Sequence, residues 1–236
     1  MEIARGAITV IHNPVAGNGK ARRKFDATLR ALESLGARVT LLHAHLGSGV
    51  LDPHHWVRVY AELAGLAERM GTVSALDIGG GLGIPQYPDE APLDLNTLAE
   101  GLAEVQQVYP QYELWMEPGR FLVAEAGILL ARVTQIKSKK TLQYLGVETG
   151  MNSLIRPALY GARHPIINLS RLHAEADTLY QVVGPICESG DILGKDCRLP
   201  RSREGDVLLI AHAGAYGAAM ASQYNLRTPA TETVIE

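Results

Sequence analysis

The sequence has few cysteines, few aromatic residues and no excess of basic charge. Two cysteines among 236 residues are too few for a disulfide framework and predict a reducing, cytoplasmic setting. The 22 basic and 25 acidic side chains give a net charge of -3, so the chain lacks the basic face that nucleic-acid binding requires. No window approaches the roughly 20 consecutive apolar residues of a membrane span. We therefore expect neither a nucleic-acid partner nor a membrane segment.

The first half of the chain has the pattern of repeated βα units. With 47% apolar residues the chain can bury a real core. Short β-branched runs at 7–11, 39–45, 73–78 and 112–117 alternate with amphipathic helical patterns. Because such alternation builds parallel sheets, we expect an α/β fold with about four βα units.

The second half of the chain has a different sequence pattern. After Gly127, short apolar strands are separated by glycine, proline, aspartate and lysine, with no long helical pattern between them. This predicts a mainly β C-terminal domain, closed by a short helix at 215–222.

Three consecutive glycines, Gly79 to Gly81, follow the third predicted strand. Without side chains in this turn, backbone N–H groups can approach an anion directly, and phosphate is the commonest such anion. The alternative is a tight turn with a purely structural role.

A second motif, Glu117, Pro118, Gly119 and Arg120, follows the next predicted strand. A carboxylate fixed by a proline turn can keep a ring nitrogen protonated, and the neighbouring guanidinium can pair with phosphate or carboxylate. A surface ion pair is the alternative.

His43 and His45 share one face of their strand by its period of two. No cysteine or carboxylate lies at metal-ligand spacing from them, so we expect core or stacking histidines and no metal.

The second domain contributes a thiol, a cation and two phenols. Cys187 and Glu188 lie in a turn after an apolar strand, where the thiol could donate a proton or could simply be half-buried. Arg156, Tyr160 and Tyr216 occur in the motifs IRPALYG and AGAYG.

Six motifs in this order resemble the diaminopimelate decarboxylases, which belong to the alanine-racemase-like class of pyridoxal 5'-phosphate (PLP) enzymes. The motifs are HAHLGSG, LDIGGGLG, EPGRFLV, GMNSLIRPALY, GPICESGD and AGAYGAAMASQYN. The resemblance runs from about residue 42 to the C-terminus. Within this range the sequence is similar to the decarboxylase half of bifunctional aspartate kinase and diaminopimelate decarboxylase proteins. It implies PLP-dependent decarboxylation of meso-diaminopimelate to L-lysine, in lysine biosynthesis, by a homodimer with shared active sites.

The resemblance also implies a role for each motif residue. His45 would stack on the cofactor ring, Glu117 would keep its nitrogen protonated, and Cys187 would protonate the carbon that loses CO₂. The implied catalytic residues are Cys187 and His45. The implied cofactor-binding residues are Ser48, Gly79, Gly80, Gly81, Glu117, Pro118, Gly119, Arg120 and Tyr216. The implied substrate-binding residues are Arg120, Arg156, Tyr160, Glu188 and Tyr216, with Cys187 and Glu188 serving the partner subunit's site.

The resemblance leaves one essential feature without a match. Family members carry a Schiff-base lysine in a motif resembling VKAN, and none of the six lysines here lies in such a motif. The barrel of such enzymes takes about 250 residues, so we expect only a partial PLP-binding barrel at 43–127 before a C-terminal β domain at 128–236. Activity should be impaired accordingly.

Residues 7–42 resemble a different family, the diacylglycerol-kinase-like lipid kinases, through the loop NPVAGNGK. We therefore expect a kinase-like βα unit at 1–42 joined to the barrel fragment. Two alternatives stay open: an ATP-dependent lipid kinase fragment, or a non-catalytic PLP- or phosphate-binding module. A rescue in which Lys20 reaches the cofactor ring is a further hypothesis.

Overall fold

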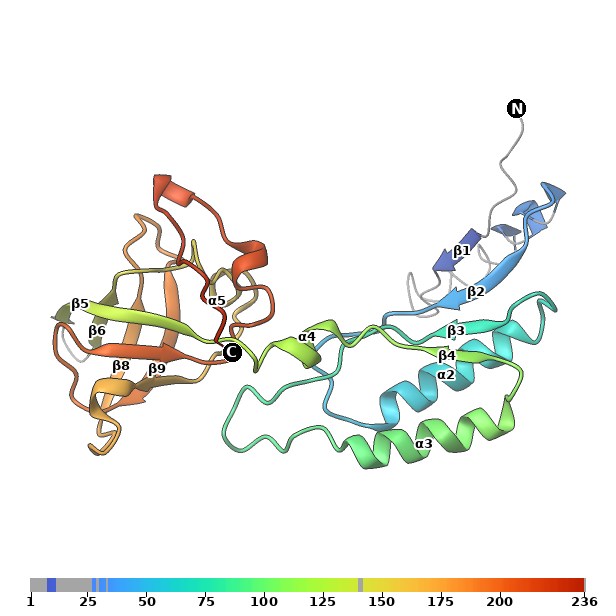
Figure 1. Cartoon of the computed structure of the whole chain (residues 1–236), viewed down its shortest axis with the longest axis horizontal. Coiled ribbons are helices and arrows are strands. Elements are labelled where there is room, and N and C mark those ends of the chain that lie inside the picture. Colours follow the sequence, from blue (N-terminus) through green and yellow to red (C-terminus); the bar gives the residue numbers. More distant parts are fainter. Residues whose placement is uncertain (1–7, 12–26, 29, 33, 140–141, 236) are drawn as a thin grey trace. The chain divides into compact units, whose positions relative to one another are not determined.

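The computed structural model describes residues 8–11, 27–28, 30–32, 34–139 and 142–235 (Figure 1). The chain divides into two compact units. The described residues within Met1–Pro85 and Ala91–Gly119 form the first unit, and those within Gln86–Glu90 and Arg120–Glu236 form the second.

The first unit is a parallel α/β sheet. Its four strands are β1 (Ile8–Ile11), β2 (Val39–His43), β3 (Ala75–Asp77) and β4 (Glu113–Trp115), hydrogen-bonded in that order and all parallel. Each strand lies beside the next one in the sequence, as in the wall of a βα barrel. The four predicted parallel strands are confirmed.

Helices α2 (His54–Ala67) and α3 (Leu95–Val108) accompany this sheet (Figure 1). Helix α2 packs against β2, β3 and α3 through an apolar stripe at helical spacing that includes the buried Trp56, Tyr60 and Leu63. Helix α3 begins at Asp94, whose carboxylate accepts hydrogen bonds from the backbone N–H groups of Asn96 and Thr97.

The second unit is built on a six-stranded sheet, which agrees with the mainly β C-terminal part expected from the sequence. Its strands are β5 (Leu129–Lys139), β6 (Leu142–Val147), β7 (Ile166–Asn168), β8 (Thr178–Val183), β9 (Ile192–Leu199) and β10 (Val207–Ile210), in the order β7-β10-β5-β6-β8-β9. Only the pair β6 and β8 is parallel; the other neighbours are antiparallel. The edge strands β7 and β9 contact each other, so the sheet curls around its apolar core.

Short helical segments complete the chain. They are α4 (Gly119–Val123), α5 (Arg156–Tyr160) and the 3₁₀ turns Leu169–Arg171, Ala218–Met220 and Tyr224–Leu226. The prediction of a helix over 215–222 is wrong in its length. Tyr216 has a φ of 62°, which is incompatible with a right-handed helix. Only the turn Ala218–Met220 forms there.

A buried carboxylate fixes the start of β10. Asp206 accepts from Arg171 Nε at 2.6 Å, from Asn168 Nδ2 at 3.0 Å and from the backbone N–H of Arg203 at 2.9 Å. The three donors compensate the loss of hydration that this buried charge suffers.

In the part of the chain that the structure describes, no helix combines the length and the apolar content that a bilayer crossing requires.

Candidate functional site

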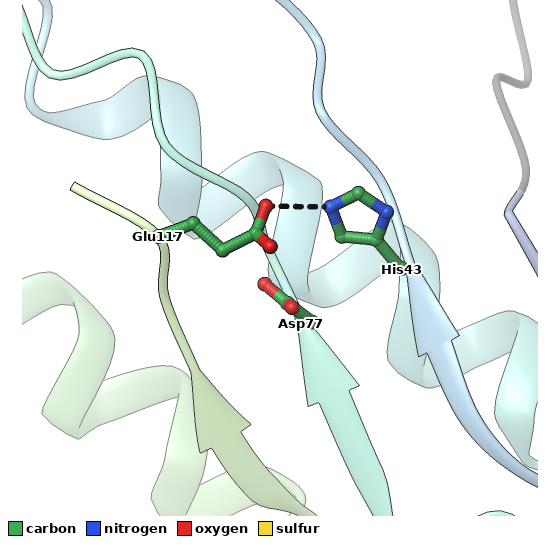
Figure 2. A group of neighbouring side chains, drawn as sticks. All are labelled: His43, Asp77 and Glu117. Atoms are coloured by element: carbon green, nitrogen blue, oxygen red, sulfur yellow. Dashed lines mark hydrogen bonds and ion pairs between the residues drawn. The ribbon is translucent and has the colours of Figure 1, made fainter. Parts of the chain in front are cut away.

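Three polar side chains meet where neighbouring strands of the first unit end. His43 is the last residue of β2 and pairs in register with Asp77, the last residue of β3. Glu117 lies two residues beyond Trp115, which is the register partner of Asp77 in β4. Since side chains alternate along a strand, Glu117 returns to the same face. Figure 2 shows the three side chains pointing toward one another.

A hydrogen bond joins two of these side chains. His43 Nε2 lies 3.0 Å from Glu117 Oε2. The side chain of His43 is 16% exposed and that of Glu117 is 56% exposed, so the carboxylate is accessible while the imidazole behind it is largely covered. The imidazole therefore fixes an accessible carboxylate in one orientation.

Asp77 begins the triple-glycine turn. Its Oδ1 accepts from the backbone N–H of Gly79 at 2.9 Å. Gly79 and Gly81 have φ values of 70° and 88°, the left-handed region that glycine adopts without strain. The chain turns sharply here because of these two glycines and the carboxylate that holds the first of them.

The glycine turn lies directly beside Glu117. The backbone N–H of Glu117 donates to the carbonyl of Gly79 at 2.9 Å. A Cβ placed on Gly80 would collide with the carbonyl oxygen of Glu117, and one on Gly81 would collide with the carbonyl of Gly47. Glycine at these positions is a packing requirement, and the two sequence motifs form one structural feature.

His45 and Ser48 lie on the loop that faces this turn. The exposed His45 accepts through Nδ1 from the backbone N–H of Gly80 at 3.1 Å. The same loop donates from Val50 N to the carbonyl of Gly81 at 3.0 Å, which keeps Ser48 next to the glycines. Two of the three glycine N–H groups thus donate within the chain, those of Gly79 to Asp77 and of Gly80 to His45.

The same three carboxyl-end side chains could also coordinate a metal. His43, Asp77 and Glu117 each offer one ligand atom, and these atoms lie within 4.8 Å of one another. Local sequence spacing offers His43 no carboxylate partner, because both partners come from other strands. The hydrogen bonds of Asp77 to Gly79 and of Glu117 to His43 already satisfy the cluster without an ion.

The second unit gathers four of the predicted substrate-binding or cofactor-binding residues. Arg156 begins α5, and Arg120, Tyr160 and Tyr216 lie close enough to affect its pKa. Burial first, and then the positive charge of Arg120, lowers the pKa of Arg156, while Tyr216 and Tyr160 act in the opposite direction. Two guanidinium groups and two phenols make this region suited to a carboxylate ligand.

Cys187 and Glu188 belong to a separate turn of the second unit. Glu188 accepts from the hydroxyl of Tyr224 at 3.1 Å and from the backbone N–H of Gly190 at 3.3 Å. The hydrogen bond from Gly190, followed by that from Tyr224, lowers the pKa of the exposed Glu188. Cys187 is a free, exposed thiol.

This turn is tied to a neighbouring loop by a buried carboxylate that sequence reasoning missed. Asp191 is 3% exposed and accepts from the backbone N–H groups of Met151 at 2.6 Å and Ile186 at 2.7 Å. Trp56, another missed residue, donates from Nε1 to the carbonyl of Gly80 at 2.9 Å and so anchors the glycine turn from α2.

Of the remaining predicted residues, Pro118 and Gly119 lie between Glu117 and Arg120, and the backbone N–H of Gly119 donates to the carbonyl of Glu117 at 2.8 Å. The loop NPVAGNGK and Lys20 lie outside the described residues.

The chain thus combines a parallel βα sheet, in which a glycine turn lies beside a carboxylate, with a curled β sheet. Comparison with known protein families identifies the family to which it belongs. The family described as "Pyridoxal-dependent decarboxylase, C-terminal sheet domain" matches residues 16–214. The chain belongs to this family of pyridoxal-dependent decarboxylases.

Curated relatives carry a more specific name. The diaminopimelate decarboxylase of Methanothermobacter thermautotrophicus is 38% identical over 228 residues, which cover 92% of this chain and 53% of the relative. That of Haemophilus influenzae is 38% identical over 236 residues, which cover 95% of this chain and 56% of the relative. The chain thus spans about half the length of the curated relatives it matches.

Solved structures agree with the fold. A crystal structure from Aquifex aeolicus has a TM-score of 0.87 at 32% identity and covers 96% of this chain and 57% of that chain. The diaminopimelate decarboxylase of Helicobacter pylori, complexed with L-lysine, has a TM-score of 0.79 at 31% identity and covers 94% of this chain and 59% of that chain.

The comparisons do not support the lipid-kinase resemblance. The family match begins at residue 16, inside the segment assigned to a kinase, and one relative, from Deinococcus radiodurans, aligns over 97% of the chain. In addition, β1 is a parallel neighbour of β2 in the same sheet as the decarboxylase motifs. We therefore abandon the kinase assignment.

Proposed function

We propose that the chain takes part in the PLP-dependent decarboxylation of meso-diaminopimelate to L-lysine. Family membership supports this reaction, and so do the names of the relatives. The structural observation that carries the proposal is the hydrogen bond between Glu117 N and Gly79 O, because it brings an accessible carboxylate next to the glycine turn.

The residues of the first unit fit the cofactor. Glycine at positions 80 and 81 lets the backbones of Glu117 and Gly47 approach the turn closely, and Ser48 lies beside the turn with a hydroxyl donor for phosphate. Glu117, oriented by His43, would hold a proton on the pyridine nitrogen, and His45 would lie against the ring face. When bound, PLP supplies an electron sink for the electron pair left by the departing carboxylate.

The residues of the second unit fit the substrate. Arg120 and Arg156 would bind a substrate carboxylate through charge-assisted hydrogen bonds, and the phenols of Tyr160 and Tyr216 would donate further ones. Cys187 would hold the proton that replaces CO₂ on the substrate carbon.

We also propose a homodimer in which Cys187 and Glu188 serve the partner subunit's site. Among the described residues, the side chain of Glu188 hydrogen-bonds to Tyr224, Ser189 and Gly190, and none of these belongs to the Arg156 group. Sedimentation equilibrium is expected to give twice the monomer mass, and a monomer at all concentrations would contradict the shared site.

The domain boundaries proposed from sequence, 43–127 for the partial barrel and 128–236 for the β domain, stay a proposal. So does the cytoplasmic setting. Helix α4 lies where the two compact units divide, at Gly119 and Arg120.

A second candidate function, a PLP-binding module without catalysis, is favoured by one observation. None of the six lysines lies in a VKAN-like motif, so no residue is identified for covalent attachment of the cofactor. The two candidates share the cofactor site and differ only in turnover.

A decarboxylation assay with a binding control separates the two. The chain is mixed with PLP and meso-diaminopimelate, and L-lysine and CO₂ are quantified, with PLP binding followed by absorbance in the same samples. Lysine formation that Arg156→Ala abolishes supports the decarboxylase, and PLP binding without turnover supports the module. If PLP fails to bind at all, both are wrong. Borohydride reduction and peptide mapping then show whether Lys20 or another lysine is modified.

A further inference from the structure

His164 is a buried imidazole of the second unit that contacts the predicted carboxylate-binding arginine. It is 6% exposed and lies two residues before the start of β7. Its Nδ1 lies 2.9 Å from the carbonyl oxygen of Ala211, and its Nε2 lies 3.2 Å from Arg156 Nη1. Both ring nitrogens are therefore engaged.

The two partners determine which nitrogen carries the proton. A carbonyl oxygen can only accept, so Nδ1 must donate to Ala211. A guanidinium can only donate, so Nε2 must be unprotonated and accept from Arg156. Ala211 is itself fixed, because its N–H donates to the carbonyl of Pro165 at 2.8 Å. This arrangement selects the neutral tautomer with the proton on Nδ1.

The surroundings of His164 keep the ring neutral. The charged or titratable groups that face it are Arg156, His212 and Arg120. Burial lowers the pKa of His164 most, against the opposing effect of the hydrogen bond to Ala211, and the neighbouring Arg156, His212 and Arg120 lower it further. A doubly protonated ring would also point its Nε2–H donor at an N–H donor of the Arg156 guanidinium.

We propose that neutral His164 is a positioning residue that orients the Arg156 guanidinium for a substrate carboxylate. This inference rests on the proposed function of Arg156. It has a physical logic: a neutral acceptor fixes the guanidinium through one N–H while leaving its charge and its other donors available. An aspartate or glutamate in the same place would neutralise Arg156 and compete with the substrate carboxylate.

Two variants test the proposal. His164→Gln keeps a neutral side chain whose oxygen can accept from Arg156 and whose amide can donate to Ala211. His164→Leu fills similar space and removes both hydrogen bonds. The exposed His173 lies in the same unit, and His173→Gln is the matched control.

The readouts are nitrogen-15 NMR of the full chain and titration with L-lysine. In the wild type we expect the His164 signals of a neutral ring, protonated on Nδ1, at neutral pH and at the ordinary histidine pKa of about 6.5, where an exposed histidine is half protonated. The Arg156 Nη signals, assigned by their loss in Arg156→Lys, should change in His164→Leu and stay close to wild type in His164→Gln. L-lysine affinity should fall about tenfold in His164→Leu, with little change in His164→Gln and His173→Gln.

Each outcome decides something. A ring protonated on Nε2 at neutral pH, or Arg156 signals and lysine affinity unchanged in His164→Leu, would overturn the inference. If the wild type shows the expected tautomer and Arg156 signals but does not bind L-lysine, the proposed substrate role of Arg156 fails while the positioning by His164 stands. PLP binding, to which neither His164 nor His173 is assigned, should be unaffected in all three variants. A loss of PLP binding in His164→Leu would indicate misfolding, in which case His164→Gln decides alone.

Discussion

Replacing Gly80 by alanine should impair cofactor binding through a backbone collision. The new Cβ would overlap the carbonyl oxygen of Glu117 and approach its carbonyl carbon to 3.1 Å. Gly80 does not have a positive φ, so its backbone conformation suits alanine and the entire cost comes from this overlap. The obstacle is backbone, which cannot rotate away as a flexible side chain can.

The expected magnitude follows from the cost of overpacking. Forcing an extra carbon into a filled site costs about 1–3 kcal/mol. If the turn relieves the overlap by moving away from Glu117, the distance between the proposed phosphate-binding turn and the Glu117 carboxylate increases. Most of this cost then appears as weaker PLP binding, because the two groups no longer match the spacing of the phosphate and the ring nitrogen. Since about 1.4 kcal/mol is a factor of ten, PLP affinity should fall by roughly 5- to 100-fold.

The assay is a PLP titration followed by absorbance, together with thermal unfolding by circular dichroism. Gly65→Ala is the matched control, because a Cβ on Gly65, within α2, meets nothing within 4 Å. Alanine there should leave PLP affinity unchanged and should stabilise the helix by up to about 1 kcal/mol. Wild-type PLP affinity in Gly80→Ala would refute the assignment of the glycine turn to the cofactor.

Three further predictions concern single side chains. Trp56→Phe should destabilise the chain by about 1–3 kcal/mol in urea unfolding, since it leaves the buried carbonyl of Gly80 without its donor; an unchanged midpoint would contradict this. Iodoacetamide at pH 8 should alkylate exposed Cys187 well before Cys197, whose pKa burial raises to about 11; peptide mass spectrometry showing equal rates would be inconsistent with the burial of Cys197. Hydrogen bonds from its three donors outweigh burial and hold the pKa of Asp206 below its usual value, so its stabilising contribution should be present above about pH 4 and lost as pH falls through the lowered value. The stability gap between wild type and Asp206→Asn, measured in urea, should therefore close toward pH 3, and a constant gap would count against this reading.

The strands and the glycine turn could be predicted from sequence because they depend on local patterns. Period-two and helical spacing locate the strands of both units, and parallel pairing brings the ends of successive strands to one edge. The approach of Gly79 to Glu117 follows from that geometry alone.

The supporting contacts could not be predicted, because they join residues distant in the sequence. His43 meets Glu117 across 74 positions of the sequence. Trp56 looked like one more residue of an apolar stripe, and its N–H donation to Gly80 has no sequence signal.

The most direct test of the whole account is phosphorus-31 NMR of PLP in the presence of the chain. If the turn from Gly79 to Gly81 and the carboxylate of Glu117 seat the cofactor, the phosphate signal should shift and broaden on binding and should stop titrating with pH across the range in which free PLP titrates. A phosphate signal that titrates as in free PLP, at chain concentrations well above the cofactor concentration, would contradict the central claim.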